Sequence, residues 1–328
     1  MSPPGLYPIH LPRRPNLNRL RLLFVLGATV LCPRDADARG QDDRPSQPAV
    51  QSPPSRITER PTSTARPLRP LPARGRVVAI GDLHGDLAAA RRVFRCAKVI
   101  DQDDHWIGGH SVVVQTGDVL DRGDDERPLL EWLDRVARQA KAAGGALYRI
   151  QGNHEVMNVA LDFRYVSETG LRAFADSSQG SVAPRGQELP DQQQGRAKAF
   201  RPGGPWANRL AAHPVVLQVN DSVFVHGGLL PHHLNHGLAR LNAEMSAWMR
   251  GSGALPPILS GDEAPYWDRT YGHTVTQEDC LALDDVLARL GAKRLVVGHT
   301  PQKGGIGFAC SGRVARIDIG LSSSHGKP

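Results

Sequence analysis

The sequence has little positive charge in the part that is expected to fold. Residues 1–74 hold 12 Arg, no Lys and 5 acidic residues, whereas residues 75–328 hold 28 basic and 28 acidic residues. A chain with a net charge of +7 would ordinarily suggest a nucleic-acid or membrane-surface partner. Because the excess lies in the N-terminal segment, we expect no nucleic-acid partner.

The sequence also lacks, near its N-terminus, an apolar run of the roughly 20 residues that a membrane-spanning helix needs. The run over residues 22–32 is too short, follows several arginines and precedes Ala36-Asp37-Ala38. This order is typical of a signal peptide, which we place at residues 1–38. We expect an exported protein, periplasmic or secreted in a bacterium, without stable membrane insertion after cleavage. A short uncleaved anchor is the alternative.

Cysteine is scarce, with four residues in the chain. Removal of residues 1–38 takes Cys32 away and leaves Cys96, Cys280 and Cys310, an odd number that cannot all pair. A disulfide between Cys280 and Cys310 suits an oxidising compartment. Three buried thiols acting as small hydrophobic side chains are the other interpretation.

The composition divides the chain into three parts. Residues 39–74 are rich in Pro, Ser, Gln, Thr and Arg, and 14 of the 26 prolines precede residue 75. Such a segment buries too little apolar surface to offset the entropy of ordering it, so we interpret it as a disordered linker. Residues 75–328 then form a single folded domain. A weakly periodic segment at about 168–208 within it is interpreted as a surface insertion.

Three short β-branched or apolar segments in the domain end in the same way. They are residues 76–80, 111–116 and 146–151, which end at Gly81-Asp82, at Gly117-Asp118 and at Gly152-Asn153. Helical periodicity between them indicates βαβ units and an α/β fold with an at least partly parallel sheet. Further strands are predicted at 214–219, 222–225, 294–297 and 314–319, with a hairpin turn at Asn220-Asp221 between the first two.

Polar side chains cluster just after these strands. In an α/β sheet, residues that follow the carboxyl ends of strands meet in one crevice. Carboxylate, imidazole and amide donors without a thiolate suit divalent manganese, iron or zinc. The residues at these positions are Asp82, His84, Asp118, Asp121, Arg122, Asn153, His154, His226 and His299.

Three of these segments resemble the signature motifs of the phosphoprotein-phosphatase family of metallophosphoesterases. They are Gly81-Asp82-Leu83-His84-Gly85, Gly117-Asp118-Val119-Leu120-Asp121-Arg122-Gly123 and Gly152-Asn153-His154-Glu155. Within the family the chain is most similar to the bacterial-type Shewanella-like phosphatases. The resemblance implies a calcineurin-like β-sandwich flanked by helices, with residues 75–328 as the catalytic domain of a phosphoric monoester hydrolase. The insertion at about 168–208 would then shape the choice of substrate.

The resemblance also implies a centre of two divalent ions, manganese, iron or zinc, with manganese favoured. Asp82 and His84 would hold the first ion, Asp118 would bridge both, and Asn153, His226 and His299 would complete the second. A bridging carboxylate reduces the repulsion between two close dications, and a hydroxide shared by the ions would be the nucleophile.

The remaining implied roles concern the phosphate and the leaving group. Arg122, Asn153 and Arg269, the last in Trp267-Asp268-Arg269, would bind phosphate oxygens. The alternative for Arg122 is a salt bridge with Asp124. His154 would be the general acid, oriented by Asp121. Glu155 is interpreted as structural, and the histidines at 232, 233 and 236 as solvent-exposed.

The favoured function is hydrolysis of phosphate monoesters in a phosphorylated protein or a small phosphomonoester. The similar subgroup implies a leaning toward phosphotyrosine over phosphoserine or phosphothreonine. One alternative keeps the metals and acts on a dinucleoside polyphosphate or a nucleotide. A second alternative is a catalytically silent binding module, although such a module would need none of the ligands.

Overall fold

The computed structural model describes residues 22–24, 68–175 and 189–325. Its first sheet is parallel throughout, in the order β1-β2-β3-β4. Its elements, with the crossover helices, are β1 (Leu22–Phe24), β2 (Val77–Ile80), α1 (Leu87–Cys96), β3 (Val112–Gln115), α2 (Glu126–Ala142) and β4 (Ala146–Arg149). The predicted βαβ units are confirmed. The other residues of the predicted signal peptide, and residues 39–67 of the predicted linker, lie outside the described residues.

The second sheet is mixed, in the order β5-β6-β7-β9-β8. Its strands are β5 (Val216–Val219), β6 (Ser222–Val225), β7 (Arg294–Val297), β8 (Gly307–Ala309) and β9 (Val314–Arg316). Strands β5 and β6 form the predicted hairpin, and Asn220 takes the positive φ of 51° that such a tight turn needs. Strand β8 was not predicted, and β9 ends at Arg316, earlier than expected.

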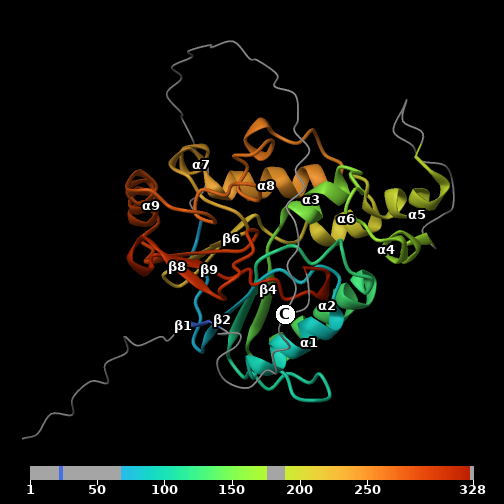
Figure 1. The fold of residues 1–328 in the computed structure, drawn as a ribbon, viewed down its shortest axis with the longest axis horizontal. Coiled ribbons are helices and arrows are strands. Elements are labelled where there is room, and N and C mark those ends of the chain that lie inside the picture. Colours follow the sequence, from blue (N-terminus) through green and yellow to red (C-terminus); the bar gives the residue numbers. More distant parts are fainter. Residues whose placement is uncertain (1–21, 25–67, 176–188, 326–328) are drawn as a thin grey trace, which may run out of the picture.

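The two sheets pack face to face, with helices on their outer faces. Val77 and Ala79 of β2 share a core with Phe224 and Val296 of the second sheet. Their neighbour Val78 belongs instead to the core that contains the outer helices. Both faces of these strands are therefore covered, which explains their nearly continuous apolar sequences. Figure 1 shows α1 and α2 on one flank and α7 (Pro231–His236), α8 (Leu238–Met249) and α9 (Gln277–Leu290) on the other. This is the predicted sandwich flanked by helices.

The predicted insertion is more ordered than its composition suggested. It contains α4 (Glu168–Arg172), α5 (Asp191–Phe200) and α6 (Pro205–Leu210), which follow α3 (Asn153–Val159), while residues 176–188 lie outside the described part. Helix α5 buries Arg196, Ala197 and Phe200. The description of this segment as a surface insertion was therefore wrong for α5, because a Gln-rich sequence concealed its buried face.

The N-terminal end of the domain also differs slightly from the expectation. Leu71 donates a backbone hydrogen bond to Gln218 and accepts one from Asn220, and Ala73 is buried. Ordered contacts thus begin before Gly75, on the edge of the second sheet.

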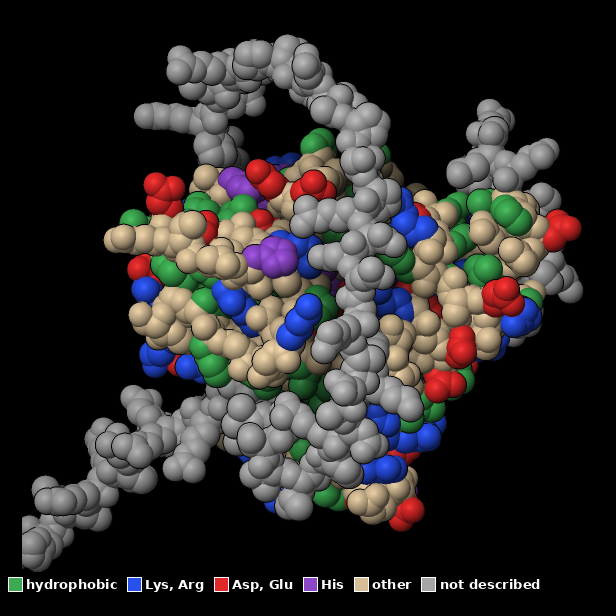
Figure 2. All heavy atoms as spheres, viewed as in Figure 1, with side chains coloured by type: hydrophobic (Ala, Val, Ile, Leu, Met, Phe, Trp, Pro, Cys, Tyr) green, Lys and Arg blue, Asp and Glu red, His purple; other side chains and the backbone are tan. Residues whose placement is uncertain are grey.

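The structure decides between the two interpretations of the cysteines. Cys280 of α9 and Cys310, directly after β8, form a disulfide, and Cys96 is not part of it. None of the described helices combines the length and apolarity needed to cross a membrane. On the face drawn in Figure 2, basic and acidic side chains alternate without forming one continuous basic surface among the described residues.

Candidate active site

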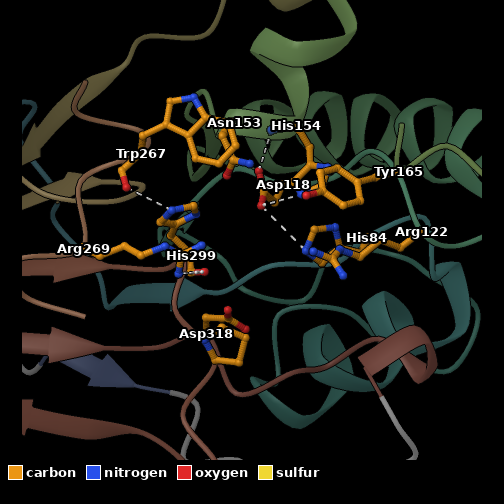
Figure 3. A pocket seen from close by; sticks show the side chains of 11 residues that line it. His84, Asp118, Arg122, Asn153, His154, Tyr165, Trp267, Arg269, His299 and Asp318 are labelled. Carbon is orange, nitrogen blue, oxygen red and sulfur yellow. Dashed lines mark hydrogen bonds and ion pairs between the residues drawn. The ribbon is translucent and has the colours of Figure 1, made fainter. Parts of the chain in front are cut away.

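The structure brings most of the predicted site residues to one pocket, at the carboxyl ends of strands from both sheets. Figure 3 shows Asp118 near its centre, with Arg122 and Arg269 on opposite sides. The pocket has a volume of about 100 Å³. Its lining is His84, Asp118, Arg122, Asn153, His154, Tyr165, Trp267, Arg269, His299, Pro301 and Asp318. Asp82 and His226 are buried behind this lining, in contact with His299 and Asp118.

The backbone at this site is held in an uncommon conformation. Five of the eleven non-glycine residues with positive φ in the described part belong to the predicted site. Such residues cost conformational energy and concentrate where a surrounding structure fixes a functional geometry. The five are His84, Asp118, Asp121, Arg122 and His299, with φ between 40° and 69°.

Two glycines allow the carboxylates to approach the backbone closely. A Cβ at Gly152 would lie 2.2 Å from Asp118 Oδ1, and a Cβ at Gly298 would lie 2.4 Å from Asp82 Oδ1. Neither position has a positive φ. These two glycines are therefore required by the lack of space for a side chain rather than by a sharp turn.

The ring of His226 identifies an electron-rich centre. Its Nδ1 lies 2.7 Å from the carbonyl oxygen of Thr116, and because this oxygen only accepts, Nδ1 carries a proton. In the neutral ring, Nε2 then carries a lone pair and no proton. It nevertheless faces two other acceptors, Asn153 Oδ1 at 3.0 Å and Asp118 Oδ2 at 3.2 Å. Three acceptors that converge in this way need a proton or a cation between them, so the donor set fits a metal ion.

Two other histidines are oriented by the same kind of contact, between a ring nitrogen and a backbone carbonyl oxygen. Nδ1 of His84 lies 3.1 Å from the carbonyl oxygen of Leu120, so that Nε2 faces Asp118 Oδ2 at 3.7 Å. Nε2 of His299 lies 3.1 Å from the carbonyl oxygen of Trp267, which leaves Nδ1 as the acceptor. Carbonyl partners that fix the tautomer of a histidine are typical of metal ligands. At this pocket, two triads of candidate ligand atoms each lie within 4.8 Å of one another: those of His84, Asp118 and His154, and those of Asp118, His226 and His299.

The electrostatics of the buried groups agree with this assignment. Burial raises the pKa of Asp82 well above its usual value, and the carboxylates of Asp318 and Asp118 raise it further. Burial lowers the pKa of His299 well below its usual value, and the neighbouring His226 adds to this effect. A divalent cation beside these groups would favour the ionised carboxylates and the neutral imidazoles, which are the forms that bind metals.

Two guanidinium groups flank the cluster without a carboxylate partner. Arg269 donates to the carbonyl oxygen of His299 at 3.2 Å and to Thr300 Oγ1 at 3.0 Å. None of the described acids forms an ion pair with Arg122 or with Arg269, and Asp124 instead accepts a hydrogen bond from Ser167. The alternative of an Arg122–Asp124 salt bridge is therefore not found. Two such cations at one pocket make a site for an anion.

His154 and Asp121 form a buried pair beside this anion site. Nδ1 of His154 lies 2.6 Å from Asp121 Oδ2, and Nε2 faces Asp118 Oδ2 at 3.8 Å. Burial alone would lower the pKa of His154, but the Asp118 and Asp121 carboxylates raise it. The imidazole can therefore hold a proton on Nε2, at the wall of the pocket.

Among the residues that the sequence did not predict here are two in the pocket lining, Asp318 and Tyr165, and one behind it, Arg196. Asp318 is buried near Asp82, and it follows β9 in the way that the other acids follow their strands, so the same rule could have found it. Tyr165 lies on a loop without periodicity. Arg196 lies on α5 and contacts Asp121.

Two further expectations have clear outcomes. The Glu155 carboxylate accepts hydrogen bonds from the backbone nitrogens of Asp118, Val119, Leu120 and Gly152, which confirms its structural role. The expectation that His233 is exposed was wrong, because its ring is fully buried. It accepts from the Leu230 nitrogen and faces the Glu263 carbonyl oxygen.

Comparisons with known proteins agree with this geometry. The family model of the calcineurin-like phosphoesterases matches residues 75–303. Shewanella-like protein phosphatase 2 of Arabidopsis thaliana is 40% identical over 279 residues, which cover 75% of this chain and 71% of that protein. Shewanella-like protein phosphatase 1 of Plasmodium berghei is 29% identical over 274 residues, which cover 77% and 70%. A solved cold-active protein tyrosine phosphatase superimposes with a TM-score of 0.65 at 26% identity, over 80% of this chain and 74% of that one.

Proposed function

Because the chain belongs to the calcineurin-like phosphoesterase family, and within it to the Shewanella-like protein phosphatases, we propose that it is a metal-dependent protein phosphatase with a preference for phosphotyrosine. The observation that carries the proposal is the pair of guanidiniums, Arg122 and Arg269, which flank a metal-ligand cluster next to the His154 imidazole. A catalytically silent binding module would need neither the ligand cluster nor the His154–Asp121 pair.

Six side chains would hold two divalent ions in this proposal. Asp118 would be shared, because its Oδ2 faces His84 on one side and His226 on the other. When bound, such ions supply a water molecule of lowered pKa and neutralise charge on a phosphoryl group. Oxygen and nitrogen donors without sulfur suit manganese, iron or zinc, and we favour manganese. The six are Asp82, His84, Asp118, Asn153, His226 and His299.

The remaining residues would bind the phosphoryl group and release the product. Arg122 and Arg269 would donate to the phosphate oxygens from opposite sides, and the Asn153 amide faces the same pocket. Fixed donors of this kind stabilise charge that develops during in-line displacement. His154 would give its Nε2 proton to the leaving oxygen while Asp121 holds Nδ1–H.

The preference for phosphotyrosine rests on the rim of the pocket. The Tyr165 side chain lies beside the general acid, with its ring centre 5.2 Å from that of His154. The Cζ atom of Arg122 lies over the same ring, 5.2 Å from its centre, and Tyr165 is 42% exposed. The ring of a leaving phenol could pack against the Tyr165 ring, whereas a leaving serine has no aromatic group that could do so. Aromatic pairs contribute about 0.5–1.5 kcal/mol beyond area burial. The solved relative at 26% identity is a protein tyrosine phosphatase.

The test is a substrate panel on metal-free protein reconstituted with manganese, iron or zinc. We expect a phosphotyrosyl peptide to be hydrolysed with a higher kcat/KM than the phosphoseryl peptide of the same sequence. Tyr165→Ala should reduce this ratio about three- to tenfold, which corresponds to the energy of one aromatic pair, and Tyr165→Phe should preserve it. Equal values for both peptides would refute the preference, and faster hydrolysis of diadenosine tetraphosphate would replace the proposed substrate class.

We also propose that the protein is exported and works in the periplasm or outside the cell, and that cleavage near residue 38 removes β1, the edge strand of the first sheet. The Cys280–Cys310 disulfide supports this, because such bonds persist mainly in oxidising compartments. The experiment is expression in a bacterium with the natural N-terminus, followed by fractionation and N-terminal sequencing. A chain that stays in the cytoplasm with residues 1–38 intact would refute export.

A further inference from the structure

Arg196 of α5 is a fully buried guanidinium with four polar partners. It donates to both carboxylate oxygens of Glu126, at 2.5 and 2.7 Å, and to the Gly170 carbonyl oxygen at 3.0 Å. It also donates to Asn158 Oδ1 at 2.7 Å and to Asp121 Oδ1 at 3.3 Å. A side chain that is 0% exposed and bonded in this way is part of a built arrangement rather than a surface feature.

Two of the other partners of Arg196, Glu126 and Asn158, also hold Asp121. The backbone nitrogen of Asp121 donates to Glu126 Oε1 at 2.6 Å. The Asp121 Oδ1 atom accepts from Asn158 Nδ2 at 2.7 Å, and this amide can donate there because its own oxygen is turned toward Arg196. All of these contacts leave Oδ2 for His154, at 2.6 Å.

The charges and the packing explain why an arginine is needed. Asp121 and Glu126 are both fully buried, and two carboxylates without a counter-charge would repel each other in a low dielectric. The planar guanidinium uses its five N–H donors for five hydrogen bonds at once, which the three donors of a lysine ammonium could not make. Three aromatic rings surround it, with centres 4.9–5.9 Å from Cζ, and keep the group in place. They belong to Phe163, Phe174 and Phe200.

We propose that Arg196 is a positioning residue for the general acid: it fixes Asp121, and through Asp121 the His154 ring, so that Nε2 points at the leaving oxygen. This inference rests on the proposed phosphatase function. It makes α5, which sequence composition places in an insertion, a required support of the acid. Arg196 itself touches neither the pocket lining nor any predicted metal ligand.

The leaving-group dependence of the rate separates positioning from a general structural role. Loss of a general acid slows substrates with poor leaving groups most. We therefore expect Arg196→Met to lower kcat for phenyl phosphate at least about tenfold more than kcat for p-nitrophenyl phosphate, with KM little changed. His154→Asn should show the same selectivity more strongly, and adding Arg196→Met to His154→Asn should not increase it further.

A matched control is the largely buried arginine of another ion pair. Arg149, whose side chain is 11% exposed, bonds Asp134 and has no hydrogen bond or ion pair with Asp121 or His154 in the described part of the chain, so Arg149→Met should lower stability without changing the leaving-group dependence. If Arg196→Met alone does not fold because Glu126 loses its partner, the double variant Glu126→Gln, Arg196→Met removes the unpaired charge and serves in its place.

Proton NMR of the metal-free protein gives a readout that is independent of turnover. The His154 Nδ1–H proton should resonate far downfield, because its bond to Asp121 is short, and His154→Asn identifies the signal by removing it. We expect this signal to shift or disappear in the Arg196 variant and to persist in Arg149→Met.

Equal losses on both substrates together with an unchanged proton signal would overturn the role of Arg196. If His154→Asn shows the leaving-group effect and the Arg196 variant does not, the inference fails and the phosphatase proposal stands. A wild-type protein that hydrolyses no phosphomonoester would refute both.

Discussion

Gly152 offers a test of how closely the site depends on the position of Asp118. Gly152 precedes α3 in an extended conformation, with φ −100° and ψ 176°, which alanine adopts without strain. Gly152→Ala would place Cβ 2.2 Å from Asp118 Oδ1 and 2.4 Å from its backbone nitrogen. The substitution therefore adds one methyl group at the carboxylate proposed to be shared by the two ions.

The size of the effect follows from the contact distance. Ordinary van der Waals contacts of a Cβ begin at 3.4 Å, so the Asp118 carboxylate must move by about 1 Å. A displacement of about 1 Å in a catalytic arrangement can reduce the rate about 100-fold. Overpacking should also cost about 1–3 kcal/mol of folding free energy, which a stable domain tolerates.

The assay is kcat/KM for p-nitrophenyl phosphate at saturating manganese, with the bound metal measured on the same samples. Gly304→Ala is the control, because a Cβ there meets no heavy atom within 4 Å and its φ is not positive. We expect roughly a 100-fold loss for Gly152→Ala and no loss for Gly304→Ala. Near-normal turnover and metal content in folded Gly152→Ala would show that the Asp118 position is not critical.

Two further predictions concern stability. Cys280→Ser should lower the free energy of unfolding by about 3–4 kcal/mol, because the disulfide closes a loop with a sequence separation of 30. Chemical denaturation of the oxidised wild type and of the variant measures this difference, and equal free energies of unfolding would contradict the prediction. Burial first, and then the charges of His232 and His236, lower the pKa of His233 to about 4. Between about pH 6.5 and 4 the unfolded chain therefore binds more protons than the folded chain. The free energy of unfolding falls as the pH drops through this window. His233→Gln can keep the bonds to Leu230 and Glu263, so it should remove about 2–3 kcal/mol of this pH dependence in urea titrations at pH 7 and pH 4; an unchanged dependence would refute the assignment.

The fold and most of the pocket were predictable because local sequence encodes them. A β-branched strand that ends at a glycine and an acid specifies both the sheet edge and the side chain placed there, as at Asp82 and Asp118. Two such sites far apart in sequence converge because parallel strands end at the same edge.

The support around Asp121 was not predictable from such local signals. Arg196 lies in a Gln-rich segment, and its burial depends on Glu126, about seventy positions away, and on three aromatic rings. No periodicity marks a charged residue that becomes buried only when distant carboxylates need a counter-charge. The burial of His233 was not predicted for a related reason, since its contacts with two backbone groups form only in the folded chain.

The central claim is that one cluster of side chains, with Asp118 shared, binds two divalent ions that are needed for hydrolysis. The most direct measurement is the amount of manganese bound per chain at equilibrium, with turnover of p-nitrophenyl phosphate, for the wild type and for Asp118→Asn. The Asn oxygen can keep the bond from the His154 nitrogen, so the variant should fold. We predict two ions for the wild type, and for the variant at most one ion with turnover reduced at least about 100-fold. A wild type that binds no ion, or a variant that keeps two ions and normal turnover, would contradict the account.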